Sequence, residues 1–400
     1  MKFVHTADWH LGQTFFEYDR KAEHLCFLEW LKCLICEQEA DALLVAGDIF
    51  DSPNPSAESQ RVFYAFLKEI TTLRPQLQIV MIAGNHDSAA RLEAPNPLLE
   101  LMNVTVRGVV RKNEDGTIDS RRLIVPLMRG DTTVAWCLAV PYLHQGDYPD
   151  AESYMQGVEK IYETLYAQVP DKSKPVVAMG HLHVTGAAVS ENDRSERIVV
   201  GGLECVSPKS FAGGIAYVAL GHLHRAQQVD GRYHVRYAGA PLPMSFAEKN
   251  YRQGVMLVTI DETTHRTTVE QMPFEPPVKL IGIPQYPKPL ADVLKEIHAL
   301  PEGDVLPQSP YIEISVLMNE PNPSLQYLVE EALKHKAVRL TRLSRVMPSI
   351  NHTSDTPEQH ELQNIHPIDM AKDVYRKRFG EELPHALCVL LQEAVEMAET

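Results

Sequence analysis

The chain has 400 residues, of which 44% are hydrophobic and 23% charged, a composition typical of a soluble globular protein with two or three domains. Its formal charge of −15 is the opposite of the basic surface expected of a protein that grips nucleic acid unaided, so metals or a partner would have to supply positive charge. Six cysteines are too few for a disulfide scaffold, and we recognise no signal peptide or membrane span. We therefore expect a cytoplasmic protein.

The first ninety residues predict three strands that alternate with two helices. Apolar runs at 2–10, 41–48 and 77–87 predict the strands, and the helical periods at 20–39 and 56–73 predict the helices between them. This order is typical of βαβ units with a parallel sheet. Polar residues just past the carboxyl ends of such strands meet in one crevice.

Five short polar motifs each follow an apolar strand. They are Asp8-x-His10, Gly47-Asp48, Gly84-Asn85-His86-Asp87, Gly180-His181 and Gly221-His222-Leu223-His224. In the first and last of these motifs, an extended backbone with a period of two would send both side chains to one face. The conjunction of all five favours one shared site, although a lone histidine after a strand is usually structural.

The remaining chain predicts a second sheet and two further segments. Short β-like runs from about residue 100 to 275 indicate the second sheet, and six prolines between Pro273 and Pro289 mark the end of the catalytic body. Residues 290–350 then alternate helix-like and strand-like runs, which indicates a small α/β domain. We predict domains at 1–275 and 276–350. We predict a linker and two short amphipathic helices at 351–400.

Mixed oxygen and nitrogen donors at the strand ends favour transition-metal binding over a pure magnesium or calcium site. The seven candidate ligands are Asp8, His10, Asp48, Asn85, His181, His222 and His224. Seven ligands are too many for one ion that must also hold water and phosphate. Two ions need a bridging ligand, and the Asp48 carboxylate is the candidate.

Other reactive residues have simpler interpretations. We expect His5 to pack within its strand, Asp87 to be a turn or cap carboxylate, and His183 to lie outside the ligand set. The Cys33-x-x-Cys36 pair has no second pair to complete a zinc site, so we expect it to fill the core. Arg225 could contact a backbone phosphate or anchor its own loop.

The motif order DxH, GD, GNHD, GH, GHxH resembles the calcineurin-like metallophosphoesterase superfamily. More narrowly, HTADWHLGQ, VAGDIFD, AGNHDS, ALGHLHRAQ and YAGAPLPMSF resemble the SbcD family of bacterial nuclease subunits. That resemblance implies an α/β fold in which a two-sheet metallophosphoesterase sandwich, flanked by helices, carries a small α/β capping domain and a helical C-terminal tail. The motifs that carry the resemblance are specific, and they lie within residues 1 to about 250.

The resemblance also implies chemistry and partners. One metal would be held by Asp8, His10, Asp48 and His224, and the other by Asp48, Asn85, His181 and His222, with manganese as the metal. The implied activity is that of a double-strand DNA exonuclease and a single-strand or hairpin endonuclease in DNA repair, recombination and replication. The implied partner is an SbcC-like coiled-coil ABC-type ATPase, with the chain forming a homodimer within a heterotetramer and the tail binding the ATPase.

Two residues are predicted to be catalytic without binding metal. If Asn85 is a ligand, the adjacent His86 should point the other way and be free to stabilise charge on the phosphate or protonate the leaving oxygen. In the superfamily an acid three residues after the bridging aspartate orients this histidine, and Asp51 occupies that position. A surface-loop or helix-cap role for Asp51 is the alternative.

Two alternative functions remain open at this stage. The net charge of −15 favours a small-substrate phosphoesterase, such as a nucleotide or cyclic-nucleotide hydrolase, but such an enzyme needs no additional domain or apolar tail. A scaffold protein for the ATPase is the other alternative, and the intact ligand set argues against it.

Overall fold

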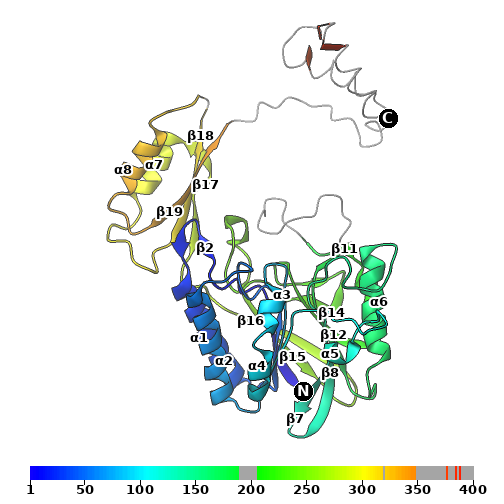
Figure 1. The fold of residues 1–400 in the computed structure, drawn as a ribbon. Coiled ribbons are helices and arrows are strands. Elements are labelled where there is room, and N and C mark those ends of the chain that lie inside the picture. Colours follow the sequence, from blue (N-terminus) through cyan, green and yellow to red (C-terminus); the bar gives the residue numbers. More distant parts are fainter. Residues whose placement is uncertain (189–204, 319, 348–374, 377–382, 385–386, 389–400) are drawn as a thin grey trace. The chain divides into compact units, whose positions relative to one another are not determined.

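The computed structural model describes residues 1–188, 205–318, 320–347, 375–376, 383–384 and 387–388. By their internal contacts the residues divide into two units, Met1–Val346 and Met347–Thr400. All helices and strands whose bounds are given below belong to the first unit (Figure 1). The predicted tail helices lie almost entirely outside the described residues.

The first six-stranded sheet has the order β16-β15-β1-β4-β5-β6. Its strands β1, β4, β5 and β6 run parallel, and β15 and β16 continue the sheet antiparallel beside β1. The bounds are β1 (Lys2–Thr6), β4 (Ala42–Ala46), β5 (Gln78–Ile82), β6 (Val104–Arg107), β15 (Gly254–Ile260) and β16 (Thr267–Pro273). The carboxyl ends of the four parallel strands therefore share one edge of the sheet.

The second six-stranded sheet has the order β13-β14-β12-β9-β8-β7. Here β8, β9, β12 and β14 are parallel, while β7 and β13 are antiparallel edge strands. The bounds are β7 (Ile124–Arg129), β8 (Thr132–Ala139), β9 (Val176–His181), β12 (Ile215–Gly221), β13 (Gln227–Val229) and β14 (Arg232–Tyr237). Two-stranded pairs are formed by β2 (Thr14–Phe15) with β3 (Tyr18–Asp19), and by β10 (His183–Val184) with β11 (Cys205–Val206).

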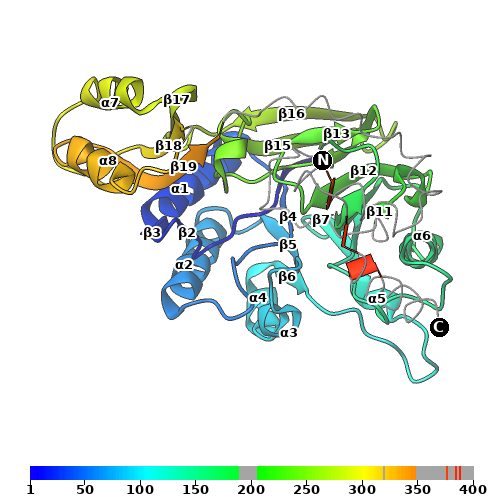
Figure 2. The same ribbon diagram turned by 90° about the horizontal axis from the view of Figure 1, so that it is seen from above.

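The two sheets pack face to face with helices on their outer faces (Figures 1 and 2). Alternation along β4 shows the arrangement, because Leu44 faces the core between the sheets while Leu43 and Val45 face the core under the helices. In the second sheet, Met179 faces the inner core and Ala178 the outer one. The molecule is thus a helix–sheet–sheet–helix sandwich, as the fold class predicted.

Helices α1 and α2 cover the first sheet, and α6 covers the second. Ser56 caps α2 by accepting a hydrogen bond from the Ser59 amide at 3.0 Å, and the apolar period of α2 buries Phe63, Leu67 and Ile70. The helices of this part are α1 (Lys21–Glu37), α2 (Ala57–Leu73), α3 (Ala89–Glu93), α4 (Asn96–Leu99), α5 (Ser120–Leu123) and α6 (Tyr154–Ala167). Single 3₁₀ turns occur at η1 (Glu100–Met102), η2 (Pro208–Ser210) and η3 (Phe246–Glu248).

Residues 280–346 form a small three-stranded sheet with its own core. Its parallel order is β17-β18-β19, and helices α7 and α8 pack on it. The bounds are β17 (Leu280–Pro289), α7 (Leu290–His298), β18 (Tyr311–Leu317), α8 (Leu325–Leu333) and β19 (Arg339–Val346). The proline-rich strand β17 is an edge strand, where proline is tolerated, and its register with β18 shifts between Ile283 and Lys288.

Buried contacts join this small sheet to the body. The Tyr311 hydroxyl donates to Glu23 Oε1 at 2.9 Å, and Glu23 pairs with the fully buried Arg20 at 2.9 Å. The Arg339 guanidinium of β19 lies 5.4 Å from the centre of the Tyr18 ring in β3. These contacts place the small sheet in the same unit as the body, so the predicted domain boundary at 275/276 stays a prediction.

Two sequence expectations need correction. Residues 254–273 were expected in the second sheet, but β15 and β16 extend the first, because the edge of β1 opposite β4 pairs with β15. The Cys33-x-x-Cys36 pair was expected to fill the core, but Cys33 is exposed and Cys36 is only partly buried against it. Among the described residues, no helix is long and apolar enough to cross a membrane.

Candidate metal centre

The loops that follow β1 and β4 continue to pair beyond the ends of their strands. The Asp8 amide donates to the Gly47 carbonyl at 3.0 Å, and the His10 amide donates to the Asp48 carbonyl at 3.0 Å. Asp8, His10 and Asp48 are thereby held at the carboxyl edge of the first sheet. The same edge carries Asn85 and His86 after β5, as the predicted crevice requires.

Four predicted ligands have a left-handed backbone. Their φ angles are +54° at Asp8, +46° at His10, +49° at Asp48 and +99° at His222. Such angles are rare for residues other than glycine and cost of order 1–3 kcal/mol each, so they persist where surrounding structure enforces them. The predicted extended geometry of the DxH and HxH motifs is therefore wrong, because tight turns aim these side chains.

Glycines before the ligands allow the main chains to approach closely. A Cβ atom on Gly84 would lie 2.1 Å from Asp48 Oδ1, and one on Gly47 would lie 2.3 Å from His181 Nδ1. Gly47 also has φ of +89°, which favours glycine. These glycines therefore create the space that the side chains of Asp48 and His181 occupy.

One group of candidate ligands consists of Asp8, His10 and His224. One donor atom from each of these three residues lies within 4.8 Å of the others, and all three residues are buried. Asp8 Oδ2 and His10 Nε2 make no hydrogen bond in the part of the chain that the structure describes. Burial of such atoms is unfavourable unless they gain a partner, and a cation would provide one.

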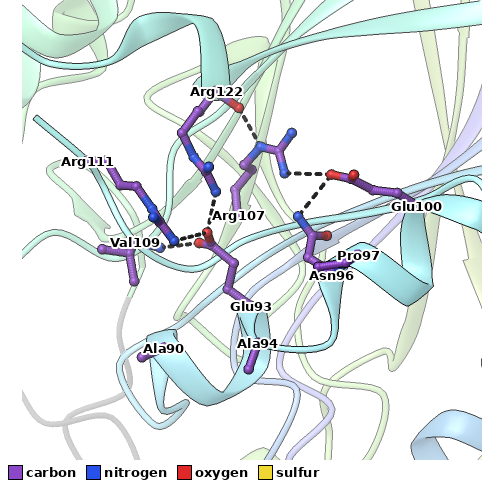
Figure 3. A pocket seen from close by; sticks show the side chains of 10 residues that line it. All are labelled: Ala90, Glu93, Ala94, Asn96, Pro97, Glu100, Arg107, Val109, Arg111 and Arg122. Atoms are coloured by element: carbon purple, nitrogen blue, oxygen red, sulfur yellow. Dashed lines mark hydrogen bonds and ion pairs between the residues drawn. The ribbon is translucent and has the colours of Figure 1, made fainter. Parts of the chain in front are cut away.

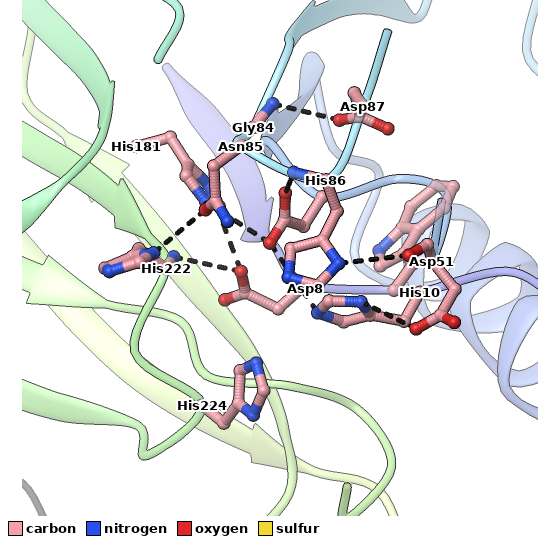
Figure 4. A network of polar contacts seen from close by, with 12 residues as sticks. Asp8, His10, Asp51, Gly84, Asn85, His86, Asp87, His181, His222 and His224 are labelled. Carbon is pink, nitrogen blue, oxygen red and sulfur yellow. Dashed lines mark hydrogen bonds and ion pairs between the residues drawn. The ribbon is translucent and has the colours of Figure 1, made fainter. Parts of the chain in front are cut away.

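The second group lies on the other side of Asp48. Asp48 Oδ2 lies 3.4 Å from His181 Nε2, which in turn lies 2.9 Å from Asn85 Oδ1. His222 Nδ1 is 3.0 Å from the same Asn85 oxygen. Figure 4 shows Asn85, His181 and His222 converging from three different segments, with His181 at the end of β9. The structure thus brings all seven predicted ligands together at one site.

Asp48 occupies the centre of this charge distribution. Its Oδ2 is 3.7 Å from His10 Nε2, and its Oδ1 accepts the His86 amide at 2.9 Å. Burial by itself would raise the pKa of Asp48, but the nearby imidazoles, His181 above all, hold it far below its usual range. Burial would likewise lower the pKa of His181, but the Asp48 carboxylate raises it to about 9.

Two of the imidazoles are oriented by hydrogen bonds from Nδ1. His181 Nδ1 lies 2.8 Å from the Ala46 carbonyl, and His224 Nδ1 lies 3.1 Å from Glu248 Oε1. A proton on Nδ1 leaves the lone pair on Nε2, where a metal ligand needs it. Glu248 is buried, and its other oxygen accepts the Met244 amide at 2.8 Å.

Glu248 was not predicted from the sequence to belong to the site. The only signal was its place two residues after the YAGAPLPMSF motif, within a stretch that carries no strand-end ligand. A carboxylate that supports a ligating histidine has no spacing of its own in the sequence. Glu248 lies 24 residues after His224 in the sequence, and the fold brings its carboxylate to the His224 ring.

His86 lies where the prediction placed it, but Asp51 acts differently. His86 Nδ1 is 3.0 Å from the main-chain carbonyl of Asp51, whereas the Asp51 carboxylate lies 3.3 Å from His10 Nδ1. The predicted carboxylate contact with His86 is therefore corrected, because the turn after Asp48 directs the Asp51 side chain toward His10. His86 points away from Asn85 and toward His10, with ring centres 4.9 Å apart (Figure 4).

The remaining polar residues near the site have structural contacts. Asp87 accepts amide hydrogen bonds from Gly84, Ile49 and Phe50 at 2.9–3.2 Å, as its predicted turn role requires. Arg225 stacks on the Tyr251 ring at 5.7 Å, which favours the loop-anchoring alternative. The Nδ1 atom of His183 lies 3.4 Å from Cys205 Sγ. His5 is buried in β1 with Nδ1 2.9 Å from the Tyr217 hydroxyl.

The donor set fits divalent metals. Buried carboxylate and imidazole atoms without hydrogen-bond partners lie beside an amide oxygen and further imidazoles, which together form a mixed oxygen and nitrogen coordination set. Of the seven candidate ligands, only Asp8 and Asp48 are acidic and four are histidines, so imidazole nitrogens are the most numerous donors at this site.

Comparison with known proteins agrees with this geometry. A family model described as calcineurin-like phosphoesterase matches residues 1–226, and a model described as type 5 capsule protein repressor C-terminal domain matches residues 276–379. The range that the phosphoesterase family model matches contains all seven candidate ligands as well as His86 and Asp51.

Curated relatives carry one common name, that of the SbcD subunit of the nuclease SbcCD. The relative from Rhodobacter capsulatus is 36% identical over 90% of this chain and 91% of its own length. The protein of the same name from Escherichia coli K12 is 33% identical over 65% of each chain. That of Bacillus subtilis is 28% identical over 96% of this chain and 95% of its own.

The chain belongs to the calcineurin-like phosphoesterase family, and within it to the group of SbcD proteins of the SbcCD nuclease. The resemblance drawn from the motifs is thereby confirmed. These comparisons support a nuclease subunit and do not favour a small-substrate phosphodiesterase or a scaffold.

The Glu248–His224 contact predicts a role for Glu248 in metal affinity. Glu248→Gln keeps an oxygen for the Met244 amide but removes the charge that makes His224 a stronger donor. We expect manganese affinity, measured by isothermal titration, to fall about 10- to 100-fold. Glu58→Gln removes an exposed carboxylate and should leave affinity unchanged. Equal affinities in the two variants would contradict the role.

Proposed function

We propose that this chain is a DNA nuclease subunit that hydrolyses phosphodiester bonds with two divalent metal ions sharing Asp48. The observation that carries the proposal is the position of Asp48 between two groups of donors. Its Oδ2 faces His10 at 3.7 Å on one side and His181 at 3.4 Å on the other. Carboxylates are the ligands best suited to bridge two ions.

The ligands divide accordingly into two sets. Asp8, His10, Asp48 and His224 would hold one ion, and Asp48, Asn85, His181 and His222 would hold the other. The proximity of Asp8, His10 and His224 supports the first set, and the convergence of His181 and His222 on Asn85 Oδ1 supports the second. We propose manganese as the metal, although this donor set would also accept iron or zinc.

When bound, two such ions supply Lewis-acid activation of the phosphate and of the attacking water. The chain itself orients the ligands and places His86 beside them. His86 is half-buried, with Nδ1 held by the Asp51 carbonyl at 3.0 Å. If that bond is donated by Nδ1, protonated His86 keeps a second N–H at Nε2 that can meet charge on the phosphate or protonate the leaving oxygen.

We propose that the substrate is DNA and the partner is an SbcC-like coiled-coil ABC-type ATPase. The support is the name shared by the curated relatives, together with motifs that extend beyond the metal ligands. Action at double-strand ends and hairpins in DNA repair, recombination and replication, and a homodimer within a heterotetramer, stay predictions from the resemblance. So does the cytoplasmic location.

The tail is proposed to dock on the ATPase. Leu387, Leu390, Leu391, Ala394 and Val395 form an apolar stripe at helical spacing, and Val374, Tyr375 and Phe379 form a shorter one. Most of these residues lie outside the described part of the chain. Packing of both stripes on the chain's own body is the alternative.

The two-ion proposal is tested at Asp48. Asparagine tolerates the left-handed backbone and can still accept the His86 amide, so Asp48→Asn should keep the fold but not the bridging charge. We expect manganese-dependent release of nucleotides from linear duplex DNA to be abolished, with metal content falling from two equivalents. Asp230→Asn, an exposed aspartate with φ of +48°, is the control. Two equivalents retained in Asp48→Asn would disprove the bridge.

His86 should separate metal binding from catalysis. His86→Ala is expected to lower the hydrolysis rate roughly 10²- to 10⁴-fold while manganese stoichiometry stays at the wild-type value. Asp51→Asn should lower the hydrolysis rate less than His86→Ala does. The variant keeps the main-chain carbonyl that holds His86, so its effect should arise from the lost contact between the Asp51 carboxylate and His10. His335→Ala, at an exposed position, controls for loss of a surface imidazole. Loss of one metal equivalent in His86→Ala would make His86 a ligand instead.

Truncation after Leu362 tests the tail. The body should keep metal-dependent activity on a chromogenic phosphodiester, because all candidate ligands precede residue 225. Co-purification with the coiled-coil ATPase should be lost, since both apolar stripes are removed. Complex formation that matches the full chain would place the docking surface elsewhere.

A further inference from the structure

A basic pocket is lined by residues of helices α3 and α4, of strand β6 and of the segments that follow β6. Its volume is about 390 Å³, and Figure 3 shows three guanidinium groups gathered around two carboxylates. The charged and polar lining consists of Glu93, Asn96, Glu100, Arg107, Arg111 and Arg122. None of these residues takes part in the proposed chemistry.

The carboxylates do not neutralise the three arginines. Arg111 Nη2 and Arg122 Nη2 both approach the same oxygen of Glu93, at 3.2 and 2.5 Å. The other oxygen of Glu93 accepts the Gly108 and Val109 amides at 3.0 Å each. Glu93 is therefore shared between two cations and the backbone of the turn after β6.

Arg107 has only a distant counter-ion. Its nearest carboxylate, Glu100, lies 3.8 Å away, while its hydrogen bonds go to the carbonyls of Val106 and Arg122. Burial and then the neighbouring Arg122 lower the pKa of Arg107, as expected for a cation beside a like charge. Arg122 Nε is buried and has no hydrogen-bond partner among the described residues. Three cations and two anions leave one uncompensated positive charge.

The pocket adjoins the metal centre through the sheet. Arg107 ends β6, which is parallel to β5, and its carbonyl accepts the Ala83 amide at 3.1 Å. Ala83 is two residues before Asn85. Adjacent strands are about 4.8 Å apart, so the main chain of Arg107 lies next to the segment that leads from β5 to Asn85. Helix α3, which carries Glu93, begins at Ala89, directly after the GNHD motif.

We propose that this pocket binds a phosphate group. Guanidinium forks match phosphate oxygens in geometry and charge, and a phosphate would supply the missing negative charge and an acceptor for the arginines. A backbone phosphate of the DNA strand held at the metal centre is the source that the location favours, and this part rests on the proposed function. A free mononucleotide offers the same chemistry. A chain with net charge −15 needs such local basic sites to hold DNA.

The test compares arginine variants in two binding assays. Arg111→Gln removes the most exposed guanidinium of the pocket, with 57% of its side chain accessible, and Arg122→Gln removes one that is 33% accessible. Arg121→Gln removes the same charge from the adjacent exposed position outside the pocket. Binding of a fluorescent 20-base-pair duplex is measured in EDTA at several salt concentrations, and dAMP binding by calorimetry. Thermal unfolding checks that each variant is folded.

If a backbone phosphate occupies the pocket, Arg111→Gln should weaken duplex binding about 3- to 10-fold. It should also reduce the slope of log K against log salt by about 0.9, which a structural role would not do. The Arg122→Gln variant should show the same two effects as Arg111→Gln, and Arg121→Gln should bind the duplex as the wild type does. Loss of dAMP binding without a duplex effect would instead identify a nucleotide as the source.

If folded Arg111→Gln matches Arg121→Gln in both assays, the pocket is an internal ion-pair network and the inference is wrong. Because Arg111 is the more exposed residue, this variant decides the matter even if Arg122→Gln fails to fold. A wild-type chain that neither binds nor cleaves duplex DNA would refute the proposed function. In that case the dAMP assay still decides whether the pocket takes phosphate.

Discussion

The geometry of the site depends on one buried carboxylate that faces two sheets. Asp48 accepts the His86 amide through Oδ1 at 2.9 Å and lies 3.4 Å from His181 through Oδ2. His86 follows a strand of the first sheet, whereas His181 ends a strand of the second. Asp48 can reach both groups only at one separation of the sheets at this edge, and a wider separation would remove the contact of this buried charge with His181.

Small residues make this approach of the sheets feasible. The core between them holds Phe3 and its partner Val258 near the start of β1, but Ala7 and Ala46 at the metal edge. A Cβ atom on Gly221 would lie 2.0 Å from the Ala46 carbonyl, so a larger residue would force the sheets apart. The strained turns at Asp8 and Asp48 follow from the same constraint, since the chain must reverse sharply to aim the ligands inward.

A buried network extends from the small sheet toward the same site. Tyr311 donates to Glu23, which holds Arg20, and Arg20 donates to the Pro243 carbonyl at 2.7 Å and to Gln13 at 2.8 Å. Gln13 lies in the turn after His10, and Pro243 adjoins Met244, whose amide binds Glu248. The small sheet thus supports both loops that position the histidines of one ligand group, which is a more direct role than that of a separate cap.

The sequence by itself determined the family and located the polar residues at the strand ends, because apolar runs and polar motifs are local features of the chain. It also predicted the helices at 20–39 and 56–73, which the structure has at Lys21–Glu37 and Ala57–Leu73. Only the tertiary structure decided the placement of β15 beside β1, the contact of Asp51 with His10, and the support of His224 by Glu248. These depend on turns with positive φ and on pairings between distant segments, and neither leaves a periodic pattern in the sequence.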